Sequence, residues 1–233
     1  MTLPKETVME GEEEQDEPGK EKRSIHEKIS AYKKSTHLEN TEDRIGISRD
    51  EELRKKQNSA KNMMREHNSI PAENIEERQK HLKQMLGKLG KNARVNQPFY
   101  VDYGSNIFLE DNTFINMNCT LLDTGKISIG RNTLIGPDVK IYTAVHDKDW
   151  HKRFWEEPEE NAAVKTWVKP VHIGKYVWIG GGATILPRVT IGDYAIIGAG
   201  AVINKDIPAG AVAVGNPCMI KDKTEMSSEM LRS

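Results

Sequence analysis

The sequence has few cysteines, few aromatic residues, no long apolar run and almost no net charge. Its 233 residues include only Cys119 and Cys218, too few for the disulfide framework of a small secreted domain. No apolar run approaches the roughly 20 residues of a membrane-spanning helix, and the N-terminus, MTLPKETVMEGEEEQDEPGK, lacks the apolar segment of a secretory signal. A net charge of −1 creates no basic field for nucleic acid or anionic lipid. We therefore expect a cytoplasmic protein that binds neither membrane nor nucleic acid.

Charged residues are concentrated at the N-terminus. Residues 1–45 are rich in Glu, Lys, Asp and Ser, and they cannot bury enough apolar surface to offset the entropy lost on ordering. We predict a disordered charged tail over 1–45 and a short C-terminal tail over 223–233. The hydrophobic content of the whole chain, 36%, is then low because the polar tails are counted together with a more apolar ordered part.

Residues 46–92 show the periodicity of amphipathic helices. After an N-cap candidate at Ser48, apolar residues follow at loosely helical spacing: Leu53, Ala60, Met63 and Met64. A second stretch begins after Pro71 and ends at Gly90, with apolar residues along one helical face: Ile75, Leu82, Met85, Leu86 and Leu89. We predict two short helices here, which need another surface to pack against.

Beyond residue 93 the helical period is replaced by a period of six. The first half of this region has aliphatic residues at six-residue intervals with one two-residue slip: Leu109, Ile115, Leu121, Ile129, Ile135 and Ile141. Residues 146–168 interrupt the pattern. It then resumes without error: Ile173, Ile179, Ile185, Ile191, Ile197 and Ile203.

A repeat of six residues is typical of a parallel β-helix. Each triangular coil of that fold uses three hexapeptides, one short strand per side, and one aliphatic residue per hexapeptide points inward. Six residues turn an α-helix by about 600°, so these isoleucines would not share a helical face. A β-sandwich would require a period of two. We predict a mainly β fold with a β-helix over 93–222, a preceding helical segment over 46–92 and an excursion loop over 146–168.

Several long motifs resemble the maltose/galactoside O-acetyltransferase family of acyltransferases. They are DYGSNIFLEDNTFINMNCTLLD (102–123), ISIGRNTLIGPDVKIYTAVH (127–146), KPVHIGKYVWIGGGATILPRVTIG (169–192) and GAGAVINKDIPAGAVAVGNPCMI (198–220). The similarity covers about residues 48–222. It implies a left-handed β-helix, a homotrimer, and acetyl-CoA bound as co-substrate between adjacent prisms, with no metal required. The implied reaction is acetyl transfer to a hydroxyl of a sugar or a related small molecule.

His146 ends the motif IYTAVH, where the repeat breaks into the loop. An imidazole with a pKa near 6.5 can take a proton from a hydroxyl at neutral pH. Spacing alone also fits a solvent-facing loop residue, whereas the resemblance implies that His146 is the general base. It further implies that the backbone N–H of Gly181, in WIGGG, donates to the thioester oxygen and that Trp178 lines the thioester channel.

The resemblance assigns two further sets of residues. Acceptor binding is expected at Asn116, Asp123, Asp102 and Tyr103. Coenzyme binding is expected at Ala199, Gly200, Asn204, Lys205 and Lys221. Each set has a structural alternative, because Asn often forms ladders inside a β-helix, Asp often caps turns, and an exposed Lys is usually only solvated.

The chain departs from the family pattern in three places. Gly46 stands where relatives have an aromatic residue, with Ser48 as the nearest polar replacement. Met219 and Asp222 occupy positions that are often cationic, which leaves Lys221 and Lys223 to supply charge. The 146–168 loop is longer than usual and holds aromatic side chains that could stack on a sugar or pin the loop to a neighbouring subunit: Trp150, Trp155 and Trp167.

Two other classes of function were weighed. His146 and His151 are five residues apart, but zinc needs three protein ligands, and the other histidines supply no upstream partner on a coil for a γ-class carbonic anhydrase site. A non-catalytic β-helix scaffold fits the acidic tail and the altered acceptor motif. The presence of His146 together with WIGGG favours an enzyme.

Overall fold

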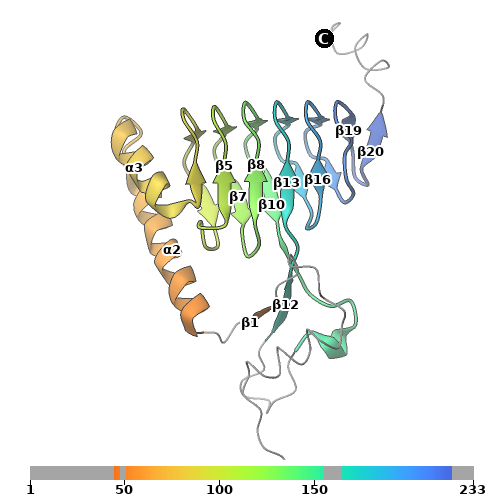
Figure 1. The fold of residues 1–233 in the computed structure, drawn as a ribbon, viewed down its shortest axis with the longest axis horizontal. Helices are drawn as coiled ribbons and strands as arrows, with labels where there is room; N and C mark the ends of the chain where they lie inside the picture. Colours follow the sequence, from red (N-terminus) through yellow and green to blue (C-terminus); the bar gives the residue numbers. More distant parts are fainter. Residues whose placement is uncertain (1–44, 48–50, 155–163, 222–233) are drawn as a thin grey trace, which may run out of the picture. The chain divides into compact units, whose positions relative to one another are not determined.

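A computed structural model describes residues 45–47, 51–154 and 164–221 of the chain (Figure 1). The tails predicted over 1–45 and 223–233 lie outside these residues except for Ile45, and so do Ser48, Trp155 and Asp222. Two helices, α2 (Glu51–Ser69) and α3 (Ile75–Met85), precede a left-handed parallel β-helix, as predicted. No helix in the described ranges is both long enough and apolar enough to cross a bilayer.

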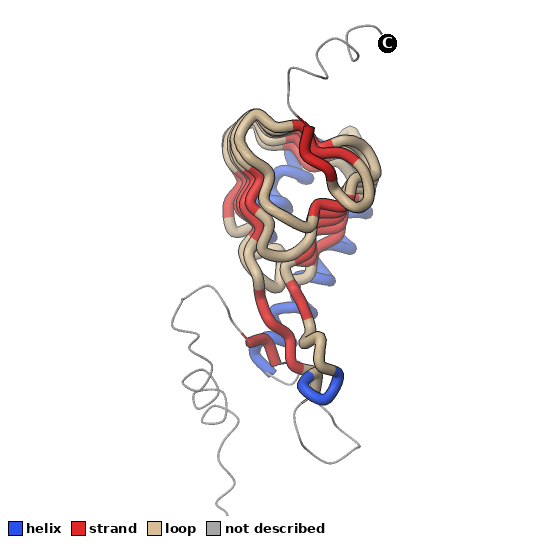
Figure 2. The backbone as a smooth tube through the Cα atoms, turned by 90° about the vertical axis from the view of Figure 1, so that its right-hand side faces the viewer, coloured by secondary structure: helices blue, strands red, loops and turns tan. Residues whose placement is uncertain are grey.

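The β-helix has three sides, each a parallel sheet (Figure 2). Side one contains β2 (Lys88–Leu89), β5 (Ile107–Leu109), β8 (Ile127–Ile129), β13 (Val171–Ile173) and β16 (Thr190–Ile191). Side two contains β3 (Arg94–Val95), β6 (Phe114–Ile115), β9 (Leu134–Ile135), β14 (Trp178–Ile179), β17 (Ile196–Ile197) and β19 (Val212–Val214), with β20 (Met219–Lys221) added antiparallel. Side three contains β4 (Phe99–Val101), β7 (Cys119–Leu122), β10 (Lys140–Tyr142), β15 (Thr184–Ile185) and β18 (Val202–Ile203).

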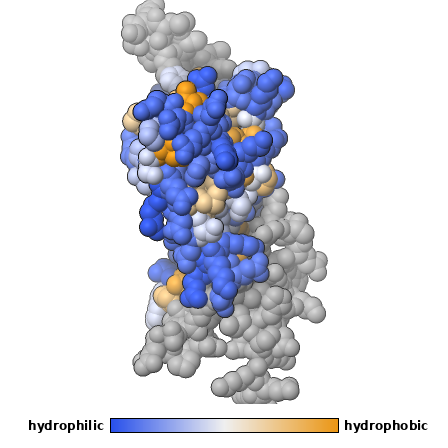
Figure 3. Space-filling view, turned by 90° about the vertical axis from the view of Figure 1, so that its left-hand side faces the viewer, coloured by the Kyte–Doolittle hydropathy of each residue, from blue (hydrophilic) through white to orange (hydrophobic). Residues whose placement is uncertain are grey.

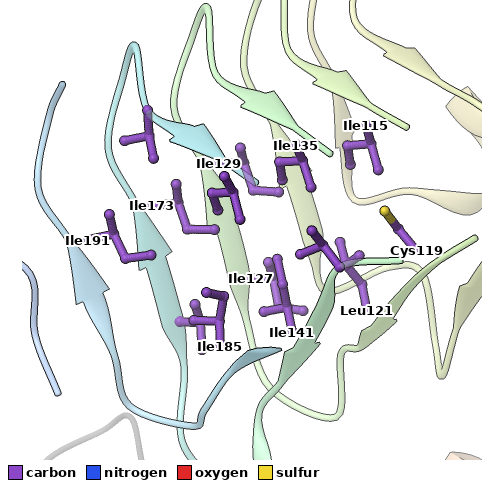
Figure 4. Packing of buried hydrophobic residues seen from close by; sticks show 14 of the residues in the cluster. Ile115, Cys119, Leu121, Ile127, Ile129, Ile135, Ile141, Ile173, Ile185 and Ile191 are labelled. Atoms are coloured by element: carbon purple, nitrogen blue, oxygen red, sulfur yellow. The ribbon is translucent and has the colours of Figure 1, made fainter. Parts of the chain in front are cut away.

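The period of six places the aliphatic residues in register inside the prism. On side two Ile115 lies opposite Ile135, which lies opposite Ile179, and all three are at most 1% exposed. Side three repeats this with Leu121, Ile141 and Ile185, and the side chains fill the interior as a continuous column (Figure 4). Each buried aliphatic side chain contributes about 1.5–3 kcal/mol of transfer free energy. The predicted core is confirmed.

Helix α3 ends five residues before the predicted end at Gly90. Leu86 is already extended (φ −89°, ψ 149°), and Leu89 is the first partly buried position of side one, opposite Leu109. A Cβ on Gly90 would lie 2.3 Å from the backbone carbon of Glu110, so the chain at this point is already packed against the next coil. The prediction was wrong because Leu86 and Leu89 fit an apolar helical stripe as well as a coil interior. Ile75 was also misplaced, since it is 65% exposed.

The two helices cover the open end of the prism and hydrogen-bond to its first strands. Asn68 of α2 donates to the carbonyl oxygen of Phe99 (2.9 Å) and accepts from its N–H (3.0 Å), as a neighbouring strand would. Arg78 and Gln79 of α3 donate to the carbonyl oxygens of Val95 and Ala93 (both 3.1 Å). An edge paired in this way cannot recruit a strand from another molecule. The outward face of the helices is mostly hydrophilic (Figure 3).

A hairpin leaves the prism between side three and side one. It is formed by β11 (Ala144–Val145), a 3₁₀ turn η1 (Trp150–Lys152) and β12 (Lys165–Val168). The segment β1 (Ile45–Ile47) pairs antiparallel with β12, so the order of this small sheet is β1-β12-β11. Its pairing was not predicted, because it joins residues about 120 positions apart.

Replacing Asn68 by Ala should destabilise the protein by about 1–3 kcal/mol, because the N–H and carbonyl of Phe99 would lose their partner. Urea unfolding measures the change. The matched control is Asn62→Ala on the same helix, where the amide is exposed and its oxygen accepts from Arg65. Equal effects of the two substitutions would refute the role given to Asn68.

His67 should make stability depend on pH. The side chain is 0% exposed, and burial, followed by the nearby Arg78 and His81, lowers its pKa from 6.5 to about 4. Between these values the unfolded chain holds more protons than the folded one, so stability falls as the pH falls. From pH 7 to pH 5 this group should remove about 2 kcal/mol. Urea unfolding of His67→Phe should show a pH dependence smaller by that amount, and an unchanged dependence would contradict the assignment.

Candidate active site

His146 directly follows β11 and its ring is held by the neighbouring strand. Its Nδ1 lies 3.0 Å from the carbonyl oxygen of Lys165 on β12. A carbonyl oxygen only accepts, so the hydrogen of this bond is on Nδ1, and in the neutral ring Nε2 then keeps its lone pair. The side chain is exposed. His146 therefore presents a proton-accepting nitrogen to the outside of the prism.

The hairpin is anchored at the corner between side three and side one, which we call the hairpin corner. Residues 102–106 and 122–126 form this corner in two successive coils, and the hairpin leaves it in the next coil. The buried Thr143 hydroxyl donates to the carbonyl oxygen of Leu122 (2.7 Å) and accepts from the N–H of Gly125 (2.8 Å). Val168, at the other end of the hairpin, fills the space above Gly125, where a Cβ would lie 2.4 Å from its Cγ1. Both strands of the hairpin thus rest on the preceding coil.

Asp123 organises the same corner one coil earlier. Its side chain is 0% exposed, and Oδ1 accepts from the N–H groups of Asp102 and Tyr103 (both 2.9 Å), while Oδ2 accepts from that of Asn106 (3.2 Å). Burial raises the pKa of Asp123, and the backbone donors oppose this rise. The carboxylate holds the 102–106 turn in place.

Asp102 and Tyr103 lie on that turn. Asp102 is half-buried, and its carboxylate accepts from Gln57 Nε2 of α2 (2.6 Å) and from the hydroxyl of Thr124 (3.1 Å). Tyr103 is half-buried beside it. The structure therefore brings three of the four predicted acceptor residues to the corner from which the His146 hairpin rises.

Asn116, the fourth, lies at the opposite end of side three. It belongs to the corner between side two and side three, the glycine corner (residues 116–118, 136–138, 180–182 and 198–200). Its Oδ1 accepts from the N–H of Met117 (2.8 Å) and from Nδ2 of Asn96 (3.3 Å), one coil away. These contacts are those of a ladder residue.

The glycine corner carries two backbone donors that are not used by the coil. In the described part of the chain, neither the N–H of Gly181 nor that of Ala199 donates to a protein acceptor. Gly200, with φ +67°, has a conformation that favours glycine, and a Cβ there would meet nothing within 4 Å. The corner is thus an open surface that can donate hydrogen bonds to a ligand. A co-substrate such as acetyl-CoA, which carries amide, thioester and phosphate oxygens, fits this donor set.

Trp178, predicted to line the thioester channel, and the remaining predicted coenzyme residues are dispersed. Trp178 lies on the outer face of side two, 50% exposed, between Leu134 and Ile196. Asn204 and Lys205 lie at the hairpin corner of a later coil and Lys221 lies in β20, all exposed. Cys218 is 4% exposed, as expected of a packed residue, and burial raises the pKa of its thiol.

The 3₁₀ turn η1 of the hairpin carries an exposed aromatic side chain. Trp150 is 66% exposed and stacks on His151, with ring centroids 3.4 Å apart. His151 Nδ1 lies 3.1 Å from Asp149 Oδ1. Trp167 is half-buried on β12. Among the residues that the structure describes, no group of three His, Cys, Asp or Glu side chains could hold a metal ion.

Four residues that hold this part of the molecule together were not predicted from the sequence: Gln57, Thr124, Gly125 and Thr143. Thr143 follows Asp123 by 20 residues, the length of one coil in this part of the prism, and both lie buried at the same corner. Coil-by-coil alignment places a small polar residue at the same corner in these two successive coils. That signal was available in the sequence.

Two family models match separate parts of the chain, and a galactoside O-acetyltransferase of Escherichia coli (strain K12) is 38% identical over 170 residues, covering 73% of this chain and 80% of the relative. Residues 47–90 match the maltose acetyltransferase hexapeptide capping motif, and residues 170–205 match the bacterial transferase hexapeptide (six repeats). Nodulation protein L of Rhizobium meliloti (strain 1021) is 46% identical over 158 residues, covering 68% of this chain and 82% of the relative. The chain belongs to the maltose/galactoside O-acetyltransferase family.

Solved structures agree with this assignment. A maltose O-acetyltransferase from Clostridium difficile 630 has a TM-score of 0.71 at 41% identity, covering 77% of this chain and 92% of its own. A galactoside acetyltransferase in complex with coenzyme A has a TM-score of 0.73 at 32% identity, covering 89% and 94%. The protein is an acyltransferase of the hexapeptide-repeat class with acetyl-CoA as co-substrate. The predicted family, fold class and co-substrate are confirmed.

Replacing Gly125 by Ala should lower the turnover of this acetyltransferase. The new Cβ would overlap Val168 and displace β12, whose Lys165 carbonyl orients the His146 ring. A loss of about tenfold in kcat is expected from a shift of this size. Steady-state kinetics of Gly125→Ala measure it, with Thr190→Ala, at an exposed strand position of side one, as the control. A kcat equal to that of the wild type would refute the coupling.

Proposed function

We propose that the protein transfers the acetyl group of acetyl-CoA to a hydroxyl of a sugar-like acceptor, with His146 as the general base. The observation that supports this most directly is the hydrogen bond from His146 Nδ1 to the Lys165 carbonyl oxygen, which leaves Nε2 free to accept a proton. The names of the similar galactoside and maltose acetyltransferases suggest the class of acceptor.

The proposed chemistry is a single displacement. Nε2 of His146 takes the proton of the acceptor hydroxyl as its oxygen forms a bond to the thioester carbonyl carbon. The carbonyl oxygen gains negative charge, which the Gly181 N–H stabilises. The C–S bond then breaks, the proton passes from the imidazolium to the departing thiolate, and the products are an acetyl ester and coenzyme A.

This chemistry requires two copies of the chain. Within one chain His146 rises from the hairpin corner, whereas Gly181 lies at the glycine corner, at the other end of side three. A strand of four residues between the corners spans about 13 Å, far more than the reach of reacting groups. We therefore propose that His146 of one chain faces the glycine corner of another, in a homotrimer.

The outer face of side two supports self-association. Leu134 and Trp178 are opposite one another on adjacent strands and are 49% and 50% exposed. The row continues along the same face with two half-buried apolar residues, Phe114 and Ile196. An apolar row of this length beside the glycine corner is typical of a surface that is covered in an assembly.

His146→Ala should lower acetyl transfer by about 10²–10⁴-fold, because the general base is removed. Binding of acetyl-CoA, measured by calorimetry, should persist, since the proposed donors are backbone groups of the other corner. The matched control is His151→Ala in the same hairpin, which should keep nearly full activity.

The assay uses labelled acetyl-CoA with simple sugars and small alcohols as acceptors. Full activity of His146→Ala would refute the role of this residue. Absence of acetyl-CoA binding to the wild type would instead favour a non-catalytic scaffold.

A further inference from the structure

The corner between side one and side two, which we call the tyrosine corner, carries a pair of exposed, stacked tyrosines. Tyr176 and Tyr194 are 47% and 48% exposed, and their rings stack with centroids 5.3 Å apart and planes 8° from parallel. Both residues have a left-handed backbone conformation, with φ of +56° and +62°. A bulky side chain in this conformation is uncommon and costs free energy, and such strain is frequent at functional sites.

The fold does not require tyrosine at these positions. The earlier coils carry asparagine at the equivalent point of the corner, also with left-handed φ: Asn92, Asn112 and Asn132. The backbone hydrogen bond to the preceding coil is the same for both residue types, as from the N–H of Asn132 to the carbonyl oxygen of Asp111 and from that of Tyr194 to that of Lys175 (both 2.9 Å). Asparagine tolerates this conformation, and its amides also form a ladder, in which Asn112 Nδ2 donates to Asn132 Oδ1 (3.0 Å). Asparagine therefore satisfies the fold here, and the two tyrosines need another explanation.

The aromatic row ends at a glycine. Gly210 takes the equivalent position in the next coil, with φ +71°, and its N–H bonds the carbonyl oxygen of Asp193 (2.7 Å) as the earlier corner residues do. Gly210 adds no side chain to the row. Neighbouring strands, and hence successive coils, lie about 4.8 Å apart, which is within the range of about 4.5–7 Å between the centroids of stacked rings. A ligand ring placed beside Gly210 would therefore continue the row by stacking on Tyr194.

Hydrogen-bonding groups of both kinds lie at the same corner. Lys175 Nζ lies 3.5 Å from Asp193 Oδ2, and the two side chains are 37% and 41% exposed. The same ammonium lies 5.9 Å from the centroid of the Tyr194 ring. A carboxylate accepts, an ammonium donates and a hydroxyl does both, so this pair suits a ring that bears several hydroxyls. It suits a nucleotide less well, because the Asp193 carboxylate would repel the phosphate.

We propose that the tyrosine corner is a non-catalytic carbohydrate-binding site. Tyr194 stacks on the C–H face of a pyranose ring of a glycan, and Lys175 and Asp193 bind the hydroxyls of that ring. Side one separates this corner from the hairpin corner, and side two separates it from the glycine corner. A sugar held here is thus away from both groups of the proposed reaction, and the inference does not depend on the role proposed for His146.

Tyr194→Asn tests this site, because it introduces the residue type that the earlier coils carry and should therefore fold. Calorimetry measures binding of maltohexaose, cellohexaose, laminarihexaose and xylohexaose. We expect the wild type to bind at least one of these glycans and Tyr194→Asn to bind it about tenfold more weakly, the equivalent of about 1.4 kcal/mol. Tyr194→Phe should keep the affinity, because the aromatic face remains. The matched control is Tyr100→Asn, which removes an exposed tyrosine of side three and should bind as the wild type does.

A wild type that binds none of the four hexaoses would overturn the proposal, and so would a Tyr194→Asn variant that binds as tightly as the wild type. Binding of AMP that depends on Tyr194, without binding of any hexaose, would overturn it in favour of a nucleotide site. If Tyr194→Asn does not fold, nitration of the wild type by tetranitromethane decides. A bound hexaose must then protect Tyr194 and leave Tyr100 reactive, and equal reactivity of Tyr194 with and without the hexaose contradicts the site.

Discussion

The structure depends on the requirement that every coil of the prism place an aliphatic residue inward at the same point on each side. Ile115, Ile135 and Ile179 satisfy it on side two, and the backbone ladders between coils follow from their stacking. A charged or bulky residue at any of these positions would separate two coils and expose both. Because apolar side chains fill the interior of the prism, the functional groups must lie at the corners or on the outer faces.

The glycine corner and the hairpin corner carry different kinds of polar group. At the glycine corner, left-handed conformations at Gly182 and Gly200 allow the backbone to turn without side chains, which leaves N–H groups at an open surface. At the hairpin corner, the buried carboxylate of Asp123 and the buried hydroxyl of Thr143 hold the turns of successive coils. One corner can serve as a donor surface and the other as a rigid base for a projecting hairpin.

Much of this was predictable because the contacts within the prism are local and periodic. The six-residue spacing identified the inward residues, and the break at His146 identified the hairpin. The end of α3 was misjudged because an apolar residue such as Leu89 fits the buried face of a helix and that of a coil equally. The pairing of Ile45–Ile47 with β12 had no signal, since strand pairing over such a separation has no local pattern.

The sequence alone determined that an aliphatic column would form, because a period of six is typical of a β-helix, in which one aliphatic residue per hexapeptide points inward. It also indicated that His146 lies outside this column. Only the tertiary structure decided which predicted residues meet. It placed Asp102, Tyr103 and Asp123 at the corner of His146 and put Asn116 at the other corner, because coil stacking brings together residues one coil apart. It also set the tautomer of His146, through a carbonyl 19 residues further along the chain.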